Sequence, residues 1–201
     1  MRRVKPMSPD SSNGAADTTR RTVLSCGVAA MTATLMGRST WAASLSSPEA
    51  GSLVPIEEFS AAGKSQGVVR VATLVRSDAE WRSQLSAAAY QVARQGGTET
   101  AFSGAYDHNH ADGLYRCVCC GTALYDSRTK FDSGTGWPSF WQSISRLNVV
   151  KSADSSLGMQ RDAISCRRCD AHLGHVFDDG PRPTGLRYCM NSVALHFVAR
   201  A

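Results

Sequence analysis

From about Tyr106 to the C-terminus, short apolar or alternating runs are separated by clusters of Gly, Asp, Ser and Pro. The runs occupy residues 114–117, 123–125, 148–151, 163–166, 186–190 and 193–198. Short runs separated by turn residues are typical of antiparallel strands joined by turns, and not of strands that alternate with crossover helices. The pattern therefore predicts a mainly β domain.

The segment before these strands has the pattern of one or two short helices. Ser77-Asp78-Ala79-Glu80 has the spacing of a capping box, which marks a helix start. Good helix formers continue to Arg94, and Gly96-Gly97 is a stop signal. Residues 44–73 are rich in Ser, Gly, Ala and Pro and show little periodicity. We therefore expect a linker over residues 44–73 and one folded domain over residues 74–201.

Most of the positive charge lies in the first 43 residues. The formal net charge of the chain is +5, and residues 1–43 hold six Lys/Arg against two acidic side chains, so they account for +4 and leave +1. A nearly neutral domain argues against a nucleic-acid partner.

The same segment has the form of a twin-arginine signal peptide. Arg20-Arg21 is followed by a weakly apolar stretch over residues 23–36 and by small residues near Ala42. That stretch is too short to span a bilayer comfortably, so we expect no stable membrane anchor. We expect export to the periplasm; a disordered basic N-terminus in a cytosolic protein is the alternative.

Four of the seven cysteines form two Cys-x-x-Cys pairs, Cys117/Cys120 and Cys166/Cys169. Each pair brings two thiolates to one side of a tight turn, and two such turns can close a tetrahedron around Zn²⁺ with no open position. Disulfides or a redox pair are the alternatives, but redox pairs occur singly at a helix start in parallel α/β folds. We expect a structural zinc, whose binding contributes on the order of 10 kcal/mol to folding. Cys119 is expected to face away from the metal.

Cys189 stands apart from both pairs, in the strand-like run Arg187-Tyr188-Cys189-Met190-Asn191. Alternation along a strand puts Arg187, Cys189 and Asn191 on one face. A neighbouring arginine lowers the pKa of a thiol, and an amide can hydrogen-bond substrate or thiolate. These features suit a reactive cysteine, although a lone cysteine is commonly a small buried hydrophobe.

Two further runs favour the reactive alternative. His172 and His175 follow the second zinc pair, and imidazoles, with an ordinary pKa near 6.5, can protonate a leaving oxygen at neutral pH. Trp137 stands between Gly136 and Pro138 and can form the wall of an apolar pocket, although tryptophan is equally common in cores.

Together these runs resemble the B type of the methionine-R-sulfoxide reductase family, over residues 74–198. The matching runs are Glu80-Trp81-Arg82, Gly97-Thr98-Glu99, Phe102-Ser103-Gly104, the Cys-x-x-Cys-Gly turn, and residues 130–140, 172–177 and 187–192. The resemblance implies two antiparallel sheets in a β-tent-like arrangement, with short N-terminal helices and a structural zinc. It implies that Cys189 is the nucleophile, with His175, His172 and Asn191 as catalytic partners. It also implies that Trp137, Arg187 and Phe177 bind the substrate.

The implied reaction reduces methionine-R-sulfoxide, free or in oxidised proteins, and leaves a sulfenic acid on Cys189. Many family members have a resolving cysteine where this chain has Thr135. We therefore expect an external thiol reductant, such as a thioredoxin-like protein, with a Cys119–Cys189 disulfide as the alternative. A monomer without an organic cofactor is expected.

Two rival functions are a ligand-binding zinc domain and a zinc-ribbon nucleic-acid module. A domain that only binds a ligand does not require Cys189 together with His172, His175 and Asn191, so their joint presence disfavours that function. The second is disfavoured by the near-neutral domain and by the export signal.

Overall fold

The computed structural model describes residues 51–155 and 160–201, all within one compact unit. The predicted signal peptide over residues 1–43 and the start of the predicted linker, residues 44–50, lie outside the described residues. Within the described part, no helix has the length and hydropathy that a membrane crossing requires.

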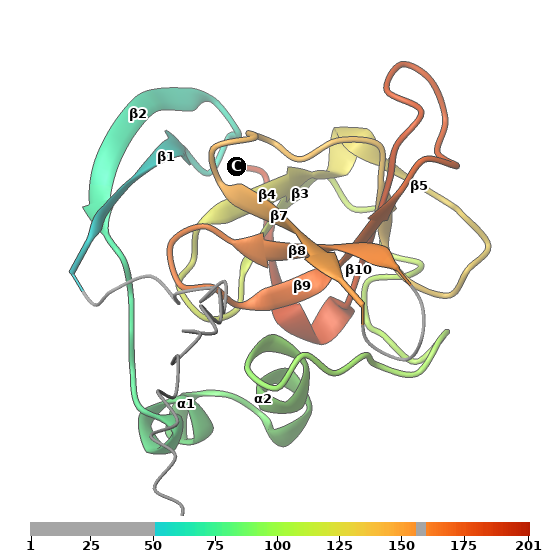
Figure 1. Cartoon of the computed structure of the whole chain (residues 1–201). Coiled ribbons are helices and arrows are strands. Elements are labelled where there is room, and N and C mark those ends of the chain that lie inside the picture. The colour runs from blue at the N-terminus through green and yellow to red at the C-terminus, as the bar shows by residue number, and fades with distance from the viewer. Residues whose placement is uncertain (1–50, 156–159) are drawn as a thin grey trace, which may run out of the picture. The chain divides into compact units, whose positions relative to one another are not determined.

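The sequence predicts a linker without regular structure up to residue 73, and for residues 53–72 this prediction is wrong. They form an antiparallel hairpin of β1 (Leu53–Phe59) and β2 (Ser65–Ala72) (Figure 1). Buried Asn148 exchanges two hydrogen bonds of 2.8 Å with the backbone of Glu57, and Arg116 donates to the carbonyl of Phe59 at 2.9 Å. Because partners far away in the chain hold the hairpin, its local periodicity does not reveal it.

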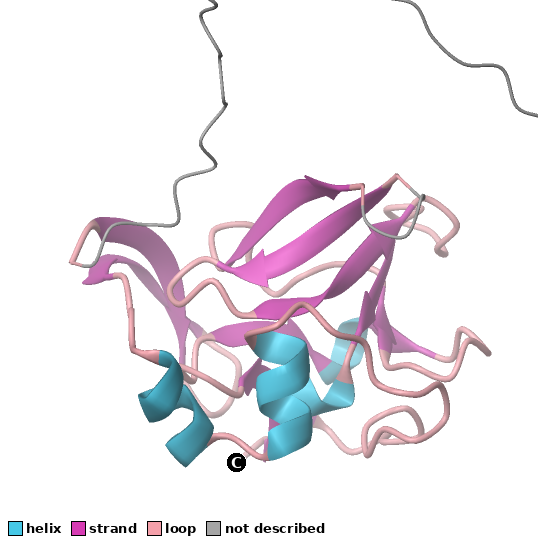
Figure 2. Cartoon of the chain, turned by 60° about the horizontal axis from the view of Figure 1, so that its bottom comes forward, coloured by secondary structure: helices cyan, strands magenta, loops and turns pink. Residues whose placement is uncertain are grey.

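Two short helices follow the hairpin: α1 (Asp78–Gln84) and α2 (Ala87–Ala93). The predicted capping box is confirmed, with Ser77 and Glu80 bonded to each other's backbone N–H groups. At α2 only the Ser86 hydroxyl caps the helix, by accepting a hydrogen bond from the N–H of Ala89 at 3.1 Å, and Gly96 adopts a φ of 67° just after the helix. Figure 2 shows the helices together on one side of the strands, where α2 packs against β9 (His172–Phe177).

The other strands form two antiparallel sheets, so the mainly β, antiparallel prediction is confirmed. The six-stranded sheet has the order β5 (Lys130–Phe131), β6 (Ser139–Phe140), β10 (Arg187–Met190), β9, β8 (Arg161–Cys166), β7 (Val149–Asp154). The three-stranded sheet has the order β11 (Leu195–Ala199), β3 (Gly113–Cys117), β4 (Ala123–Asp126). Short 3-10 helices lie at Ser127–Thr129 and Ser192–Ala194.

An aromatic core joins the two sheets. Tyr125 of β4 stacks on Phe140 of β6 with ring centroids 4.5 Å apart, and Tyr115 of β3 meets Phe140 edge-on at 5.0 Å. The hydroxyl of Tyr125 donates to the sulfur of Met190 at 3.0 Å. Met190 is therefore directed into this core, and alternation along β10 turns Cys189 toward the opposite face of the sheet.

Candidate active site and metal centre

The four paired cysteines come together as predicted. Their sulfur atoms all lie within 4.8 Å of one another, and Cys119 does not belong to the set. The Cys117–Cys169 sulfur distance is 3.6 Å and the Cys120–Cys166 distance is 3.5 Å. A zinc–sulfur bond of about 2.3 Å gives tetrahedral edges of about 3.8 Å, so the cluster fits a tetrahedral ion.

Each pair sits on a turn that the backbone closes. The N–H of Gly121 donates to the carbonyl of Cys117 at 2.9 Å in the β3–β4 turn. The N–H of Asp170 donates to the carbonyl of Cys166 at 2.8 Å in the β8–β9 turn, with Asp170 at a φ of 55°. The two turns belong to different sheets, so an ion held by all four thiolates would join the sheets.

Cys189 lies in β10 between two neighbouring strands. Its Cα partners are His175 on β9 and Ser139 on β6. The hydroxyl of Thr135 lies 3.9 Å from its sulfur. The thiol is half-buried, so it is neither sealed in the core nor fully exposed to solvent.

The environment of Cys189 differs in one respect from the sequence prediction. Burial raises the pKa of the thiol above its ordinary value, while the Thr135 hydrogen bond and the positive charge of Arg187 act to lower it. The sequence reveals the arginine but not the burial, which has the larger effect. A thiolate at Cys189 therefore depends on the groups around it.

Arg187 is fixed near Cys189. Its guanidinium forms two hydrogen bonds of 2.8 Å with the carboxylate of Asp179, which hold the pKa of Asp179 below its ordinary value. The same guanidinium lies 4.4 Å from the ring centroid of Phe177. Arg187 thus orders Phe177 and places a positive charge near Cys189.

The two histidines share one face of the sheet because β9 contains a bulge. Ile164 pairs with Gly174 and Ser165 pairs with His172, so Leu173 is an extra residue. Without this residue, a spacing of three would put the imidazoles on opposite faces. With it, the rings of His172 and His175 meet edge-on at 5.2 Å.

The two imidazoles have different surroundings. Burial, followed by repulsion from His175, lowers the pKa of His172 to about 4. His172 Nε2 is buried and has no hydrogen-bond partner among the described residues. His175 Nε2 instead lies 2.8 Å from Asp154 Oδ2, and this aspartate also accepts a hydrogen bond from Arg161 at 2.9 Å. Only His175 is therefore held by a carboxylate at Nε2.

A cavity of about 100 Å³ lies at Cys189. It is lined by Thr98, Trp137, Arg161, Gly174, His175, Phe177, Cys189 and Asn191. Five of the seven non-metal residues named from the sequence meet here. The other two contact lining residues, Arg187 at the ring of Phe177 and His172 at the ring of His175.

Hydrogen bonds hold Trp137 and Asn191 of the wall in place. Trp137 Nε1 donates to the carbonyl of Glu99 at 3.1 Å. Asn191 accepts a hydrogen bond from the N–H of Glu99 at 2.9 Å and donates one to the carbonyl of Leu173 at 3.0 Å. The amide of Asn191 is thus largely committed to the scaffold around the cavity.

Sequence reasoning missed several residues of the site, among them Thr98, Arg161 and Asp154. Thr98 belongs to a run that matches the family, but no chemistry had been assigned to it. Asp154 ends β7 and Arg161 begins β8, and the pairing of β7 with β8 and of β8 with β9 brings Asp154 to His175. A single acidic residue or arginine within a predicted strand does not by itself indicate that the residue belongs to a functional site.

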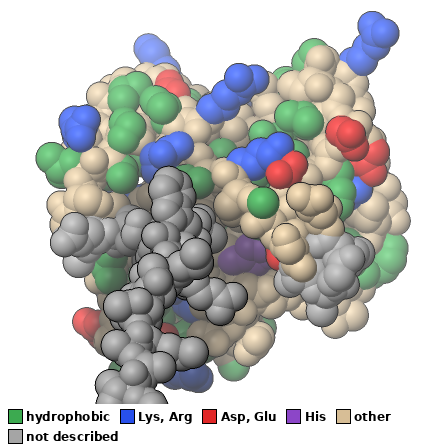
Figure 3. Space-filling model, in the orientation of Figure 1, with side chains coloured by type: hydrophobic (Ala, Val, Ile, Leu, Met, Phe, Trp, Pro, Cys, Tyr) green, Lys and Arg blue, Asp and Glu red, His purple; other side chains and the backbone are tan. Residues whose placement is uncertain are grey.

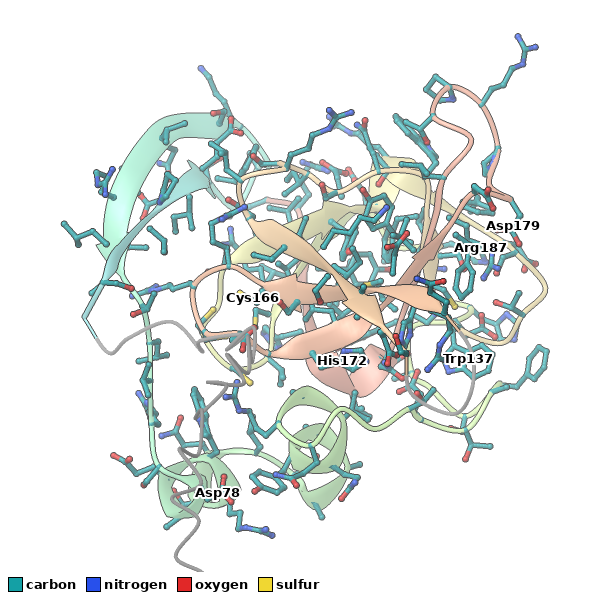
Figure 4. The ribbon with its side chains drawn as sticks, viewed as in Figure 1. Asp78, Trp137, Cys166, His172, Asp179 and Arg187 are labelled. Atoms are coloured by element: carbon teal, nitrogen blue, oxygen red, sulfur yellow. The ribbon has the colours of Figure 1, made fainter. Side chains whose placement is uncertain are left out.

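The metal cluster and the cavity lie apart along the sheet. Figure 4 labels Cys166 on one side of the view and Trp137 and Arg187 on the other, with His172 between them. Histidine is visible in the same central region of the space-filling view (Figure 3). None of the four clustered cysteines lines the cavity.

Known proteins are similar in sequence to this chain. A family model described as the SelR domain matches residues 85–199. The peptide methionine sulfoxide reductase MsrB of Pseudomonas putida (strain F1) is 57% identical over 121 residues, 60% of this chain and 92% of the relative. The protein of the same name from Synechococcus sp. (strain RCC307) is 54% identical over 121 residues, 60% of this chain and 89% of the relative. The chain therefore belongs to the SelR-domain family of MsrB-type reductases, oxidoreductases that act on methionine (R)-sulfoxide.

Proposed function

We propose that Cys189, as a thiolate, reduces methionine-R-sulfoxide in the cavity that Trp137, His175 and Phe177 line with it. The observation that carries the proposal is the meeting of a thiol, an imidazole and an indole around one space of about 100 Å³. A space of this size suits the sulfoxide end of a side chain and leaves the rest of a peptide or protein substrate outside.

The proposed step transfers the sulfoxide oxygen to Cys189. The thiolate attacks the sulfoxide sulfur while a proton is delivered to its oxygen. The attack forms a sulfur–sulfur bond. The hydroxyl then moves to the sulfur of Cys189, so that the sulfur–oxygen bond of the substrate and the new sulfur–sulfur bond both break, methionine leaves, and Cys189 is left as a sulfenic acid. The sulfur of Cys189 gives up the two electrons that the substrate sulfur gains.

His175 is the proposed proton source. It stands across the strand pair from Cys189 and lines the cavity. Because Asp154 engages Nε2, Nδ1 is the ring nitrogen left to transfer a proton. His172 is less suited, because with a pKa of about 4 it carries no transferable imidazolium proton at neutral pH. Its role is to pack against the ring of His175.

Apolar contact is the proposed means of substrate binding. Trp137 and Phe177 offer aromatic surface for the methyl group and the aliphatic stem of the substrate. Asn191, held by Glu99 and Leu173, completes the wall, and Arg187 favours the thiolate form of Cys189. Oxidised methionine within proteins is the proposed natural substrate, which makes the activity one of protein repair.

An external thiol is proposed to regenerate Cys189. Two thiol groups of a thioredoxin-like protein, or of another reductant, return the sulfenic acid to the thiol and yield one disulfide and one water. Thr135 occupies the position next to Cys189 where many relatives have a resolving cysteine. Cys119 lies in the turn of Cys117 and Cys120, and no residue of this turn lines the cavity, which disfavours an internal disulfide.

Zn²⁺ is the proposed ion of the four-cysteine cluster. Cys117, Cys120, Cys166 and Cys169 would hold it with no open position, so its contribution is to folding and not to the reaction. The arginine pair within residues 1–43 supports export of the folded protein by the twin-arginine route, with the metal loaded before export. A monomer in the periplasm remains part of the proposal.

The two epimers of methionine sulfoxide in one peptide test the proposal. With dithiothreitol as reductant, we expect wild type to consume the R epimer only and Cys189→Ser to consume neither. Cys119→Ser is the matched control and should keep activity. Consumption of the R epimer by Cys189→Ser at the wild-type rate would rule out the assigned nucleophile.

A further inference from the structure

Glu99 bonds to the segment that directly follows the strand of the nucleophile. Its carboxylate accepts a hydrogen bond from the N–H of Ser192 at 2.7 Å and another from the N–H of Val193 at 3.0 Å. These donors open the 3-10 helix Ser192–Ala194, where backbone N–H groups have no partner within the helix. The carboxylate thus ties the loop that contains Glu99 to the end of β10.

The backbone of the same residue holds two side chains of the cavity wall. Its N–H donates to Asn191 Oδ1 at 2.9 Å, and its carbonyl accepts a hydrogen bond from Trp137 Nε1 at 3.1 Å. Asn191 and Trp137 both line the cavity beside Cys189. One residue therefore links the end of the catalytic strand to two parts of the wall.

The chain closes over this carboxylate at Gly104. A Cβ at that position would lie 2.4 Å from Glu99 Oε1 and 2.3 Å from Ser192 Oγ, closer than real Cβ contacts occur. The N–H of Tyr106 also donates to Ser192 Oγ at 3.1 Å. The close approach at Gly104 leaves the carboxylate little room to take another position.

We infer that Glu99 is a positioning residue, whose carboxylate sets where the indole of Trp137 and the amide of Asn191 stand relative to Cys189. The inference rests on the proposed function in one respect, that these two side chains line the reacting cavity. Without the carboxylate, the loop would be held mainly by its hydrogen bonds to Trp137 and Asn191, which are the two side chains that it orients. A merely capping role would instead affect stability and leave the cavity wall in place.

The test compares Glu99→Gln with a matched control, Glu80→Gln, in the zinc-loaded full chain. Glu80 also accepts a backbone N–H at a helix start, but it is exposed and caps α1 away from the cavity. One readout is kcat/KM for a methionine-R-sulfoxide peptide. The other is the indole N–H signal of Trp137 in ¹H–¹⁵N spectra, assigned by its loss in Trp137→Phe.

We expect Glu99→Gln to lower kcat/KM by about tenfold or more, because small displacements of substrate-positioning groups have effects of this size. The Trp137 indole signal should shift and exchange faster with water, while that of Trp81 stays unchanged. The pH dependence of Cys189 alkylation should also stay unchanged, because Thr135 and Arg187, not Glu99, act on the thiol. Glu80→Gln should match wild type in every readout.

Wild-type kcat/KM in Glu99→Gln, or a lower value with an unmoved Trp137 signal, would overturn the inference. If that variant does not fold, Gly104→Ala crowds the same carboxylate and Glu99→Asp shortens its reach, and an unmoved Trp137 signal in the folded variant overturns it equally. If wild type reduces no sulfoxide, the proposed function fails, while the Trp137 signal still decides whether Glu99 anchors the wall.

Discussion

Replacing Asp154 by Asn tests the proposed proton transfer by His175 with almost no change of shape. Asp154 Oδ2 lies 2.8 Å from His175 Nε2, and the two side chains are 21% and 10% exposed, so solvent screens the pair only in part. A hydrogen bond to a charged group contributes about 1.5–3 kcal/mol. Since about 1.4 kcal/mol corresponds to a tenfold change in rate, we expect kcat/KM to fall about 10- to 100-fold.

The assay is a single turnover on a methionine-R-sulfoxide peptide at neutral pH. An amide offers a weaker, uncharged hydrogen bond to the imidazole than a carboxylate does, so proton delivery from His175 should slow. Asp162→Asn is the matched control, because Asp162 also lies in the β7–β8 pair, where its carboxylate bonds Lys151 at 2.7 Å instead of a histidine. A wild-type rate in Asp154→Asn, or an equal loss in Asp162→Asn, would refute the reasoning.

Three further predictions concern the metal, the recycling step and the thiol. Cys120→Ser should lose bound zinc and its cooperative thermal transition, since the binding free energy, about 10 kcal/mol, equals a typical domain stability; metal analysis and calorimetry check this, with Cys119→Ser as control. Thr135→Cys places a thiol where a hydroxyl lies 3.9 Å from the Cys189 sulfur. After one turnover without reductant, that variant should lose water to a disulfide by mass spectrometry, whereas wild type should retain the sulfenic acid. Arg187→Met removes a charge that lowers the pKa of Cys189, so alkylation of Cys189 should require higher pH; an unshifted profile would show that Arg187 has no effect on the pKa of the thiol.

Local signals explain which parts of the fold the sequence predicts. The capping box at Ser77 and Glu80 and the two Cys-x-x-Cys turns each lie within a few residues, and each has the predicted geometry. The strand runs are found because alternation and turn residues are also local. The hairpin β1–β2 is missed because Asn148 and Arg116, far along the chain, hold it in place.

The residues of the site divide in the same way, into those with a local sequence signal and those that depend on distant contacts. Cys189 and His175 could be named because thiol and imidazole are recognisable by type. Asp154 and Glu99 could not, because each acts through a bond that only the folded chain forms. The pKa of Cys189 is a clear example of what the sequence leaves out. The neighbouring arginine, which lowers this pKa, can be read from the sequence, but the burial that raises it by more cannot.

The alternation of β10 explains why the position of Cys189 is coupled to the core. Met190 bonds with Tyr125 inside the aromatic core, and Cys189, one residue earlier, faces the cavity. The backbone between them passes so close to Gly174 that a Cβ there would lie 2.1 Å from the carbonyl oxygen of Cys189. The bulge that brings the two histidines to one face therefore also needs a glycine at its end, because only glycine lets β9 and β10 approach closely enough to set His175 opposite Cys189. Core packing and catalytic geometry are thus set by the same pair of strands.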